Sequence, residues 1–293
     1  MENCLIKDRF KFVQVVSFCP HGSRWKGIDT FSGKEIYAKL YVKSVELSFW
    51  YEVQVLKDLR NFPNLPNLLW HGQVGFRNEE YDCIIYEMLG PNLEEVMSHV
   101  GKFTFRATVL LAQKLLKALE TLHKMGYVHR KLQPKHILIG KGIRSSQFYL
   151  VGMKDWKRYN LASNDDKGAF IGHINFASLR SHNHLELGPA DDLISLVYIL
   201  IHLNQQLPWS ILENKDRLED VKEAKTNVRN SELCRNFPPE FKRFLDHCMS
   251  LELNDKPDYE LLYSFLDRIA KLREFKQNHL YEWSFIMTMS RNS

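Results

Sequence analysis

The sequence predicts an α+β fold, with strands in the first third of the chain and helices in the remainder. β-Branched and aromatic residues dominate from Phe10 to Val16 and again from Glu35 to Val42, and Ser32-Gly33-Lys34 between them forms a turn. Beyond about residue 90, apolar residues recur at helical spacing instead. Strands followed by helices indicate an α+β domain, because α/β folds interleave the two along the chain.

Two more elements are expected in the first third. Apolar residues between Val45 and Leu59 recur at helical spacing, and the turn-rich run from Asn61 to Asn67 ends this helix. The segment from Tyr81 to Met88 is predicted to be a strand, closed by Gly90-Pro91.

Three helices are expected farther along. Phe105 to Met125 is amphipathic, with Thr104 as its N-cap and Gly126 just past its end. Asp191 to Leu203 is nearly all apolar, which predicts a helix buried on most sides. A further helix begins at Phe237-Pro238-Pro239 and runs through His247.

Composition and charge exclude several classes of protein. The 293 residues are 44% hydrophobic, which is enough for a sizeable core. The net charge of +5 comes from 40 basic and 35 acidic residues without a long run of one sign. Because nucleic-acid-binding proteins usually concentrate basic residues on one face, we expect no nucleic-acid partner.

The cysteines and apolar segments indicate an intracellular protein, in the cytoplasm or the nucleus. Five cysteines without a C-x-x-C pair favour buried thiols over disulfides or a zinc site. The N-terminus has no apolar core of signal-peptide length. The longest apolar stretch, around Leu193 to Leu203, is too short to span a bilayer, so no membrane partner is expected.

Several short motifs follow one another in a fixed order. They are Tyr86-Glu87-Met88-Leu89-Gly90-Pro91-Asn92-Leu93-Glu94, Thr121-Leu122-His123, Tyr127-Val128-His129-Arg130, Asp191-Asp192-Leu193-Ile194-Ser195-Leu196, Leu207-Pro208-Trp209, Asn254-Asp255-Lys256-Pro257-Asp258-Tyr259 and Tyr281-Glu282-Trp283. In this order they resemble the casein kinase 1 family of serine/threonine protein kinases. The resemblance implies a bilobal kinase-like fold over residues 10–285, with a strand-rich N-lobe (about 10–88), a helical C-lobe (about 92–285) and a short tail (286–293).

The resemblance implies that part of the nucleotide site is retained. The ATP-binding lysine of the family falls on Lys39, and its ion-pair partner falls on Glu52 of the following helix. We favour the interpretation that Lys39 is vestigial and that the pair tethers the helix to the sheet. The three glycines of the phosphate loop read Ser17, Cys19 and Gly22. This loss indicates a weaker phosphate site, because glycines allow backbone amides to approach phosphate closely.

The adenine pocket of the family is expected to be filled. Its lining positions are occupied by Arg24, Tyr37 and Tyr86, all of which are large. Three bulky residues are hard to reconcile with a space shaped for a purine. The alternative is that Tyr37 turns outward.

The resemblance also implies loss of the catalytic and metal-holding residues. Lys131 stands at the position of the catalytic Asp, and the metal-holding Asn and Asp positions are His136 and Gly152. Magnesium needs hard oxygen ligands, which these two residues do not offer. Asp155, three positions later, is interpreted as an ordinary loop carboxylate. We therefore expect no catalytic residue, no metal and no cofactor.

Substrate recognition is expected to be lost as well, while the scaffold is kept. Two basic residues that the family uses for anion binding are replaced by Pro189-Ala190. Asp192 is retained, and the resemblance implies that it holds the backbone of the catalytic loop.

These replacements predict a catalytically inactive, casein kinase 1-like pseudokinase that serves signal transduction as a protein-binding or regulatory scaffold. The alternative is a residual or unconventional serine/threonine kinase that uses ATP and magnesium. It is favoured by four retained residues, Lys39, Glu52, His129 and Asp192. A third hypothesis is a metal-free polyanion site, unless the lysines concerned point into solvent. These lysines are Lys39, Lys131, Lys135 and Lys154.

Overall fold

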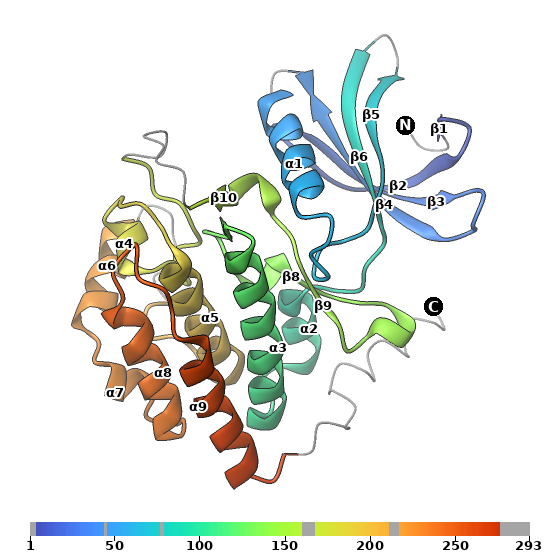
Figure 1. Cartoon of the computed structure of the whole chain (residues 1–293). Helices are drawn as coiled ribbons and strands as arrows, with labels where there is room; N and C mark the ends of the chain where they lie inside the picture. Colours follow the sequence, from blue (N-terminus) through green and yellow to red (C-terminus); the bar gives the residue numbers. More distant parts are fainter. Residues whose placement is uncertain (1–3, 44–45, 77–78, 160–167, 211–216, 276–293) are drawn as a thin grey trace.

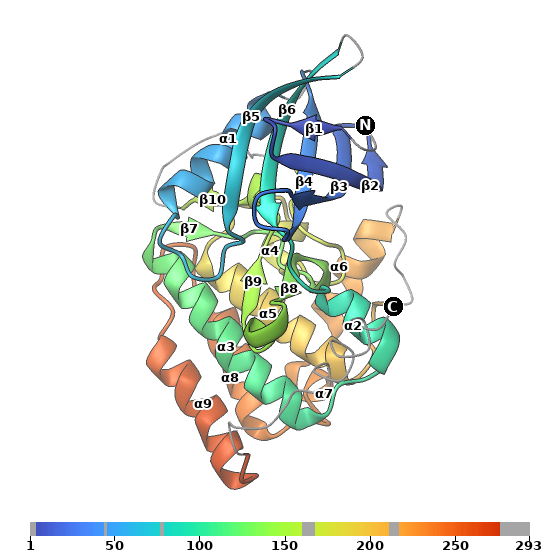
Figure 2. The same cartoon turned by 90° about the vertical axis from the view of Figure 1, so that its right-hand side faces the viewer.

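The computed structural model describes residues 4–43, 46–76, 79–159, 168–210 and 217–275 (Figure 1). An antiparallel sheet of six strands in the order β1-β2-β3-β4-β6-β5 forms the N-terminal lobe. Its strands are β1 (Leu5–Ile6), β2 (Phe10–Cys19), β3 (Gly22–Asp29), β4 (Glu35–Val42), β5 (Leu68–Phe76) and β6 (Glu79–Glu87). Helix α1 (Glu46–Asp58) lies against this sheet, and the helical lobe lies beyond it (Figure 2).

Side chains of the central strand β4 alternate between two environments. Ile36, Ala38 and Leu40 are buried in a small core on one face of the sheet. Tyr37 and Tyr41 pack against a larger core, which continues into the helical lobe. This alternation follows from the period of two in a strand, and it directs the odd-numbered residues toward α1 and the other lobe.

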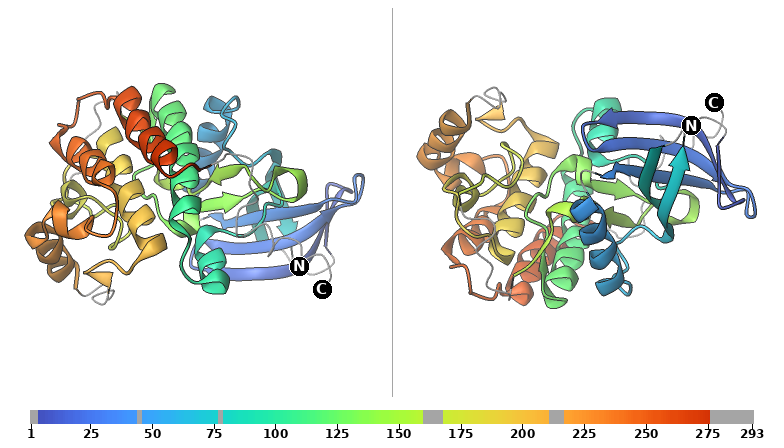
Figure 3. Two further views of the ribbon diagram at one scale, coloured as in Figure 1. Left: turned by 90° about the horizontal axis from the view of Figure 1, so that it is seen from below. Right: turned by 90° about the horizontal axis from the view of Figure 1, so that it is seen from above.

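The second lobe is mainly helical. Its helices are α2 (Leu93–Val100), α3 (Phe105–Lys124), α4 (Leu179–His182), α5 (Pro189–Asn204), α6 (Leu218–Asn227), α7 (Asn230–Leu233), α8 (Pro239–Ser250) and α9 (Tyr259–Leu272). Every residue of α5 from Pro189 to Ile201 is buried, because α3 and α8 pack on this helix. Helices α3 and α9 lie side by side (Figure 3).

Short elements between α3 and α4 carry the residues discussed below. They are β7 (Tyr127–Val128), η2 (Pro134–His136), β8 (Ile137–Ile139), η3 (Gly142–Arg144), β9 (Phe148–Leu150), η4 (Met153–Asp155) and β10 (Lys157–Arg158). Strand β7 pairs with β10, and β8 pairs with β9. These ladders place the segment after β9 beside the segment after β7.

The predicted α+β class is confirmed, and the predicted strands and helices are present within a few residues of their expected ends. The side chain of Thr104 caps α3 by accepting a hydrogen bond from the backbone N–H of Ala107. The sequence analysis missed β3 and β5. The terminal motif around Trp283 and the tail 286–293 lie outside the described residues.

No helix in the described parts of the chain is long and apolar enough to cross a membrane.

Candidate functional site

The buried carboxylate of Glu52 lies on the side of the sheet that faces α1 and the helical lobe, and the region between the two lobes is named the cleft. Glu52 is only 1% exposed and belongs to α1. Lys39 Nζ lies 2.5 Å from Glu52 Oε1, and Tyr86 donates its hydroxyl hydrogen to the same oxygen over 2.6 Å. Tyr41 donates to the other carboxylate oxygen. Three donors on β4 and β6 therefore fix α1 against the sheet.

These contacts determine the charge of the network. Burial alone would raise the pKa of the Glu52 carboxyl, but the Lys39 ammonium and the hydrogen bonds outweigh it and hold that pKa below its usual value. Burial and the neighbouring Glu52 charge raise the pKa of the Tyr86 hydroxyl. The network is thus a carboxylate with one ammonium ion and two neutral phenols.

Tyr37 lies on the cleft face of β4 and is not turned into solvent. It is opposite Tyr86 in the pairing of β4 with β6, and its side chain packs against the large core. Burial raises the pKa of its hydroxyl. Arg24 on β3 shares this face, with its guanidinium carbon 5.6 Å from the ring centre of Tyr41. The residues that the sequence predicted to be pocket-filling therefore lie together.

The turn between β2 and β3 is tight. The ladder continues to the pair Cys19–Gly22, so that only two residues, Pro20 and His21, connect the strands. Gly22 has a φ of 138°, and a Cβ atom there would lie 1.9 Å from the carbonyl oxygen of Leu40. The close approach of β4 thus requires glycine at this position, whether or not a phosphate binds.

Asp192, at the start of α5, holds the loop after β7. It accepts hydrogen bonds from the backbone N–H groups of His129 (2.6 Å) and Arg130 (2.8 Å). Its Oδ2 atom also lies 2.9 Å from His123 Nε2 on α3. Arg130 has a φ of 64°, an uncommon conformation that these contacts maintain. The backbone of this loop is therefore fixed by a carboxylate in the core.

Lys131 follows this fixed turn and faces a carboxylate. Its Nζ atom lies 3.7 Å from Asp155 Oδ2 on η4. Arg130 Nε donates to the backbone oxygen of Asp155 over 2.6 Å, which holds η4 against the loop. The sequence analysis treated Asp155 as an ordinary loop residue and missed this pairing, because two separate segments create it.

His136 and Gly152 are in direct contact. Gly152 has a φ of 95°, and a Cβ atom on it would lie 2.9 Å from both Cε1 and Nδ1 of the His136 ring. His136 Nδ1 donates to the Lys131 carbonyl oxygen over 3.0 Å. Burial, and secondarily the neighbouring His129, lower the pKa of His136 to about 3, so that its ring is neutral near pH 7. An imidazole thus fills the space beside Gly152.

A comparison with protein families identifies the fold around this cleft. The family model described as protein kinase domain matches residues 22–263. The chain belongs to the protein kinase domain family. The cleft between the sheet and the helical lobe, which contains Lys39 and the loop after β7, is therefore where kinases bind nucleotide.

The four lysines predicted to form a polyanion site have different surroundings in this kinase domain. Burial and Lys225, and then Lys131 and Lys135, lower the pKa of His173 to about 4. Lys131 and Lys39 contribute to the lowered pKa of His136 after burial and His129. Lys39 pairs with Glu52 and Lys131 with Asp155, whereas Lys135 and Lys154 are exposed.

The positions at which the sequence analysis expects the metal-holding residues offer no carboxylate. Within the described residues, no group of three or more His, Cys, Asp or Glu side chains is arranged to hold a metal ion. The donors at these positions are the His136 ring and the backbone of Gly152. Mg²⁺ prefers hard oxygen ligands in near-octahedral geometry, so these two residues do not fit it.

Proposed function

We propose that this protein kinase domain is a casein kinase 1-like pseudokinase that acts in signalling as a protein-binding scaffold. The observation that carries the proposal is the contact of His136 with Gly152. Both stand at positions where the casein kinase 1 resemblance implies magnesium ligands, and the imidazole ring lies where the side chain of an aspartate at residue 152 would begin. Without magnesium, the charge that develops on a transferred phosphoryl group is not neutralised.

Two further contacts support the absence of phosphoryl transfer. Lys131, at the position of the catalytic Asp, pairs with Asp155 and carries a positive charge where an acceptor for the hydroxyl proton is needed. Tyr37 and Arg24 share the cleft face of the sheet on which adenine packs in the family. Neither arrangement favours the binding or the use of ATP.

The retained contacts support a role that depends on the folded surface. Asp192 still fixes the loop after β7, and Glu52 still joins α1 to the sheet. In an active kinase both serve catalysis, but here each stabilises the packing within its own lobe. A protein-binding scaffold needs this arrangement and no turnover.

The test is a thermal-shift titration with ATP, in magnesium and again in excess chelator, followed by a phosphate-transfer assay. Because a ligand that binds only the folded state raises Tm, we expect no shift in either condition. We also expect no magnesium-dependent transfer. Transfer that the Lys39→Ala substitution abolishes would overturn the proposal in favour of a residual serine/threonine kinase.

A second candidate function is metal-free binding of a polyanion in the cleft. It is favoured by Lys131 and Lys135, two cationic side chains on the loop after β7 and on η2, of which Lys135 is exposed. Inorganic tripolyphosphate with chelator is the probe. Binding that weakens with salt and is lost in the Lys131→Ala/Lys135→Ala variant supports it, and absence of binding at low salt rejects it.

We also propose an intracellular location, in the cytoplasm or the nucleus. The five cysteines are all free, which suits a reducing compartment. Fluorescence microscopy of the tagged chain tests this assignment.

A further inference from the structure

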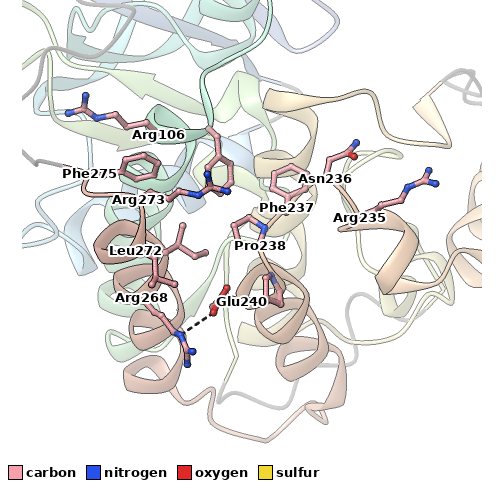
Figure 4. Close-up of a pocket in the computed structure, with 13 residues that line it drawn as sticks. Arg106, Arg235, Asn236, Phe237, Pro238, Glu240, Arg268, Leu272, Arg273 and Phe275 are labelled. Atoms are coloured by element: carbon pink, nitrogen blue, oxygen red, sulfur yellow. Dashed lines mark ion pairs between the residues drawn. The ribbon is translucent and has the colours of Figure 1, made fainter.

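A groove lies in the helical lobe, where the beginnings of α3 and α8 meet the end of α9 (Figure 4). Its volume is about 850 Å³. The floor contains three phenylalanines, with ring centres 6.0 Å apart for Phe105 and Phe237 and 6.2 Å apart for Phe105 and Phe275. Leu272 at the edge is 69% exposed. The groove thus offers an apolar floor to a side chain from outside.

The charged residues of this groove are mostly positive. Four arginines and one glutamate line it, namely Arg106, Arg235, Arg268, Arg273 and Glu240. Arg268 Nε lies 3.2 Å from Glu240 Oε1, so that one arginine is neutralised within the groove. Figure 4 shows Arg268 and Arg273 at the end of α9 beside the groove, whereas Arg106 on α3 and Arg235 before α8 extend outward on opposite sides of it. Helices α3 and α8 also direct their positive N-terminal ends toward it.

Two of these arginines have unused hydrogen-bonding capacity. Arg235 and Arg273 are exposed, and neither side chain makes an ion pair or a hydrogen bond with any residue that the structure describes. A guanidinium group matches a carboxylate with two parallel hydrogen bonds. The groove is therefore complementary to a ligand that carries several carboxylates around an apolar group.

We propose that this groove binds an acidic segment of a partner protein, with an aromatic or leucine side chain of that segment placed on the phenylalanine floor. An acidic segment is thus a partner class for the proposed scaffold function, on which this assignment rests. A buried apolar anchor surrounded by charge pairs is the usual arrangement in such interfaces.

Charge complementarity favours this occupant over others from the same chain. Residues 276–293, which follow Phe275, contain a single acidic residue, Glu282, together with Lys276 and Arg291. A second copy of the chain has a net charge of +5. The segment 276–293 therefore supplies no cluster of carboxylates, and the like net charge of two copies disfavours self-association at the groove.

The experiment measures fluorescence anisotropy of a fluorescein-labelled synthetic peptide in which a Phe-Leu pair is flanked by glutamates. Saturable binding to the full chain is expected, and it should weaken by about tenfold or more in Arg235→Glu/Arg273→Glu. The matched control is Arg60→Glu/Arg243→Glu, which reverses two exposed arginines outside the groove and should change the affinity less than about twofold. Peptides with Gln for Glu, or with Ser for Phe and Leu, are expected to bind weakly.

Several outcomes would overturn the inference. They are the absence of saturable binding, an equal loss in both double variants, and tighter binding of a single-stranded oligonucleotide that depends on Arg235 and Arg273. Binding that requires removal of residues 276–293 would assign the groove to that segment. Self-association that is lost in Arg235→Glu/Arg273→Glu would assign it to a second copy.

The peptide-binding experiment and the phosphate-transfer assay can fail independently of each other. Phosphate transfer by the chain with intact peptide binding would reject the pseudokinase proposal alone. Absence of transfer together with absence of binding would reject the groove alone.

Discussion

At the scale of single residues, the Lys39–Glu52 pair is expected to serve stability instead of catalysis. Lys39→Ala should lower the free energy of unfolding by about 3 kcal/mol, because it leaves a buried carboxylate without its cation. Urea unfolding of both proteins measures this change. The control is Lys43→Ala, which removes an ion pair whose two side chains are both more than half exposed and should leave stability unchanged. Equal midpoints for wild type and Lys39→Ala would contradict the prediction.

His136 predicts a dependence of stability on pH. Burial lowers its pKa to about 3 in the folded state, whereas an unfolded histidine titrates near pH 6.5. The unfolded state therefore binds the proton more readily between these values, and stability is complete above about pH 6.5 and falls as the pH is lowered.

Between pH 7 and pH 5, wild type should lose about 2 kcal/mol more than His136→Asn, which has no titrating ring. Urea unfolding at the two pH values gives the difference. His184→Asn, at an exposed histidine, serves as the control and should follow wild type. Parallel losses in all three proteins would show that other groups are responsible, such as His173 and His182, whose pKa values burial lowers to about 4.

At the scale of elements, β3 and β5, which are two of the strands that the sequence analysis missed, have unusual compositions. Strand β3 reads Gly-Ser-Arg-Trp-Lys-Gly-Ile-Asp. Its glycines, its serine and its terminal aspartate interrupt the alternation of apolar and polar residues that is typical of a half-buried strand. Strand β5 contains Gly72 and Gly75. A Cβ atom on Gly72 would lie 2.8 Å from the ring of Trp70, so a folded-back tryptophan accounts for this glycine. Local propensity cannot reveal such contacts.

The helices α1, α3, α5 and α8 were predictable from spacing, but the strand pairing and the contacts between segments were not. The amphipathic pattern and the N-cap of α3 are local, and both are present in the structure. The contact of His136 with Gly152 joins η2 to the residue after β9, and Lys131 meets Asp155 across the same gap. The resemblance assigned His136 and Gly152 separately to metal-holding positions. Only the fold shows that the His136 ring fills the space beside Gly152.

Gly22 provides the prediction for the sheet. Gly22→Ala should destabilise the chain by more than about 2 kcal/mol, since it combines an unfavourable φ with a clash against the backbone of β4. Gly75→Ala on β5 is the control, because a Cβ atom there meets nothing within 4 Å, and its effect should stay within about 0.5 kcal/mol. Thermal and urea unfolding measure both. Equal effects would mean that Gly22 is a relic of a phosphate loop without a structural role.

At the scale of the whole molecule, the two buried carboxylates that stabilise the fold are distinct from the residues at the expected catalytic and metal positions. Glu52 joins α1 to the sheet, and Asp192 joins α5 to the loop after β7 and to α3. Both carboxylates are almost completely buried, so their loss would affect the core of either lobe. Lys131, His136 and Gly152, at the positions expected for the catalytic and metal-holding residues, are only partly buried. Their replacement is therefore compatible with a stable two-lobed structure.

This separation predicts that restoring the chemical positions alone does not restore nucleotide binding. The triple variant Lys131→Asp/His136→Asn/Gly152→Asp regains the expected catalytic base and both metal ligands. His136→Asn removes the ring that a Cβ atom on residue 152 would meet. Tyr37 and Arg24 still lie on the face of the sheet where adenine is expected, however, so ATP with magnesium should leave the Tm of the triple variant unchanged.

Adding Tyr37→Ala and Arg24→Val to the triple variant should produce a magnesium-dependent rise in Tm. The same two substitutions in the wild-type chain should produce none. A rise in the triple variant itself would show that Tyr37 leaves room for the base, and the metal positions would then be the sole barrier to nucleotide binding.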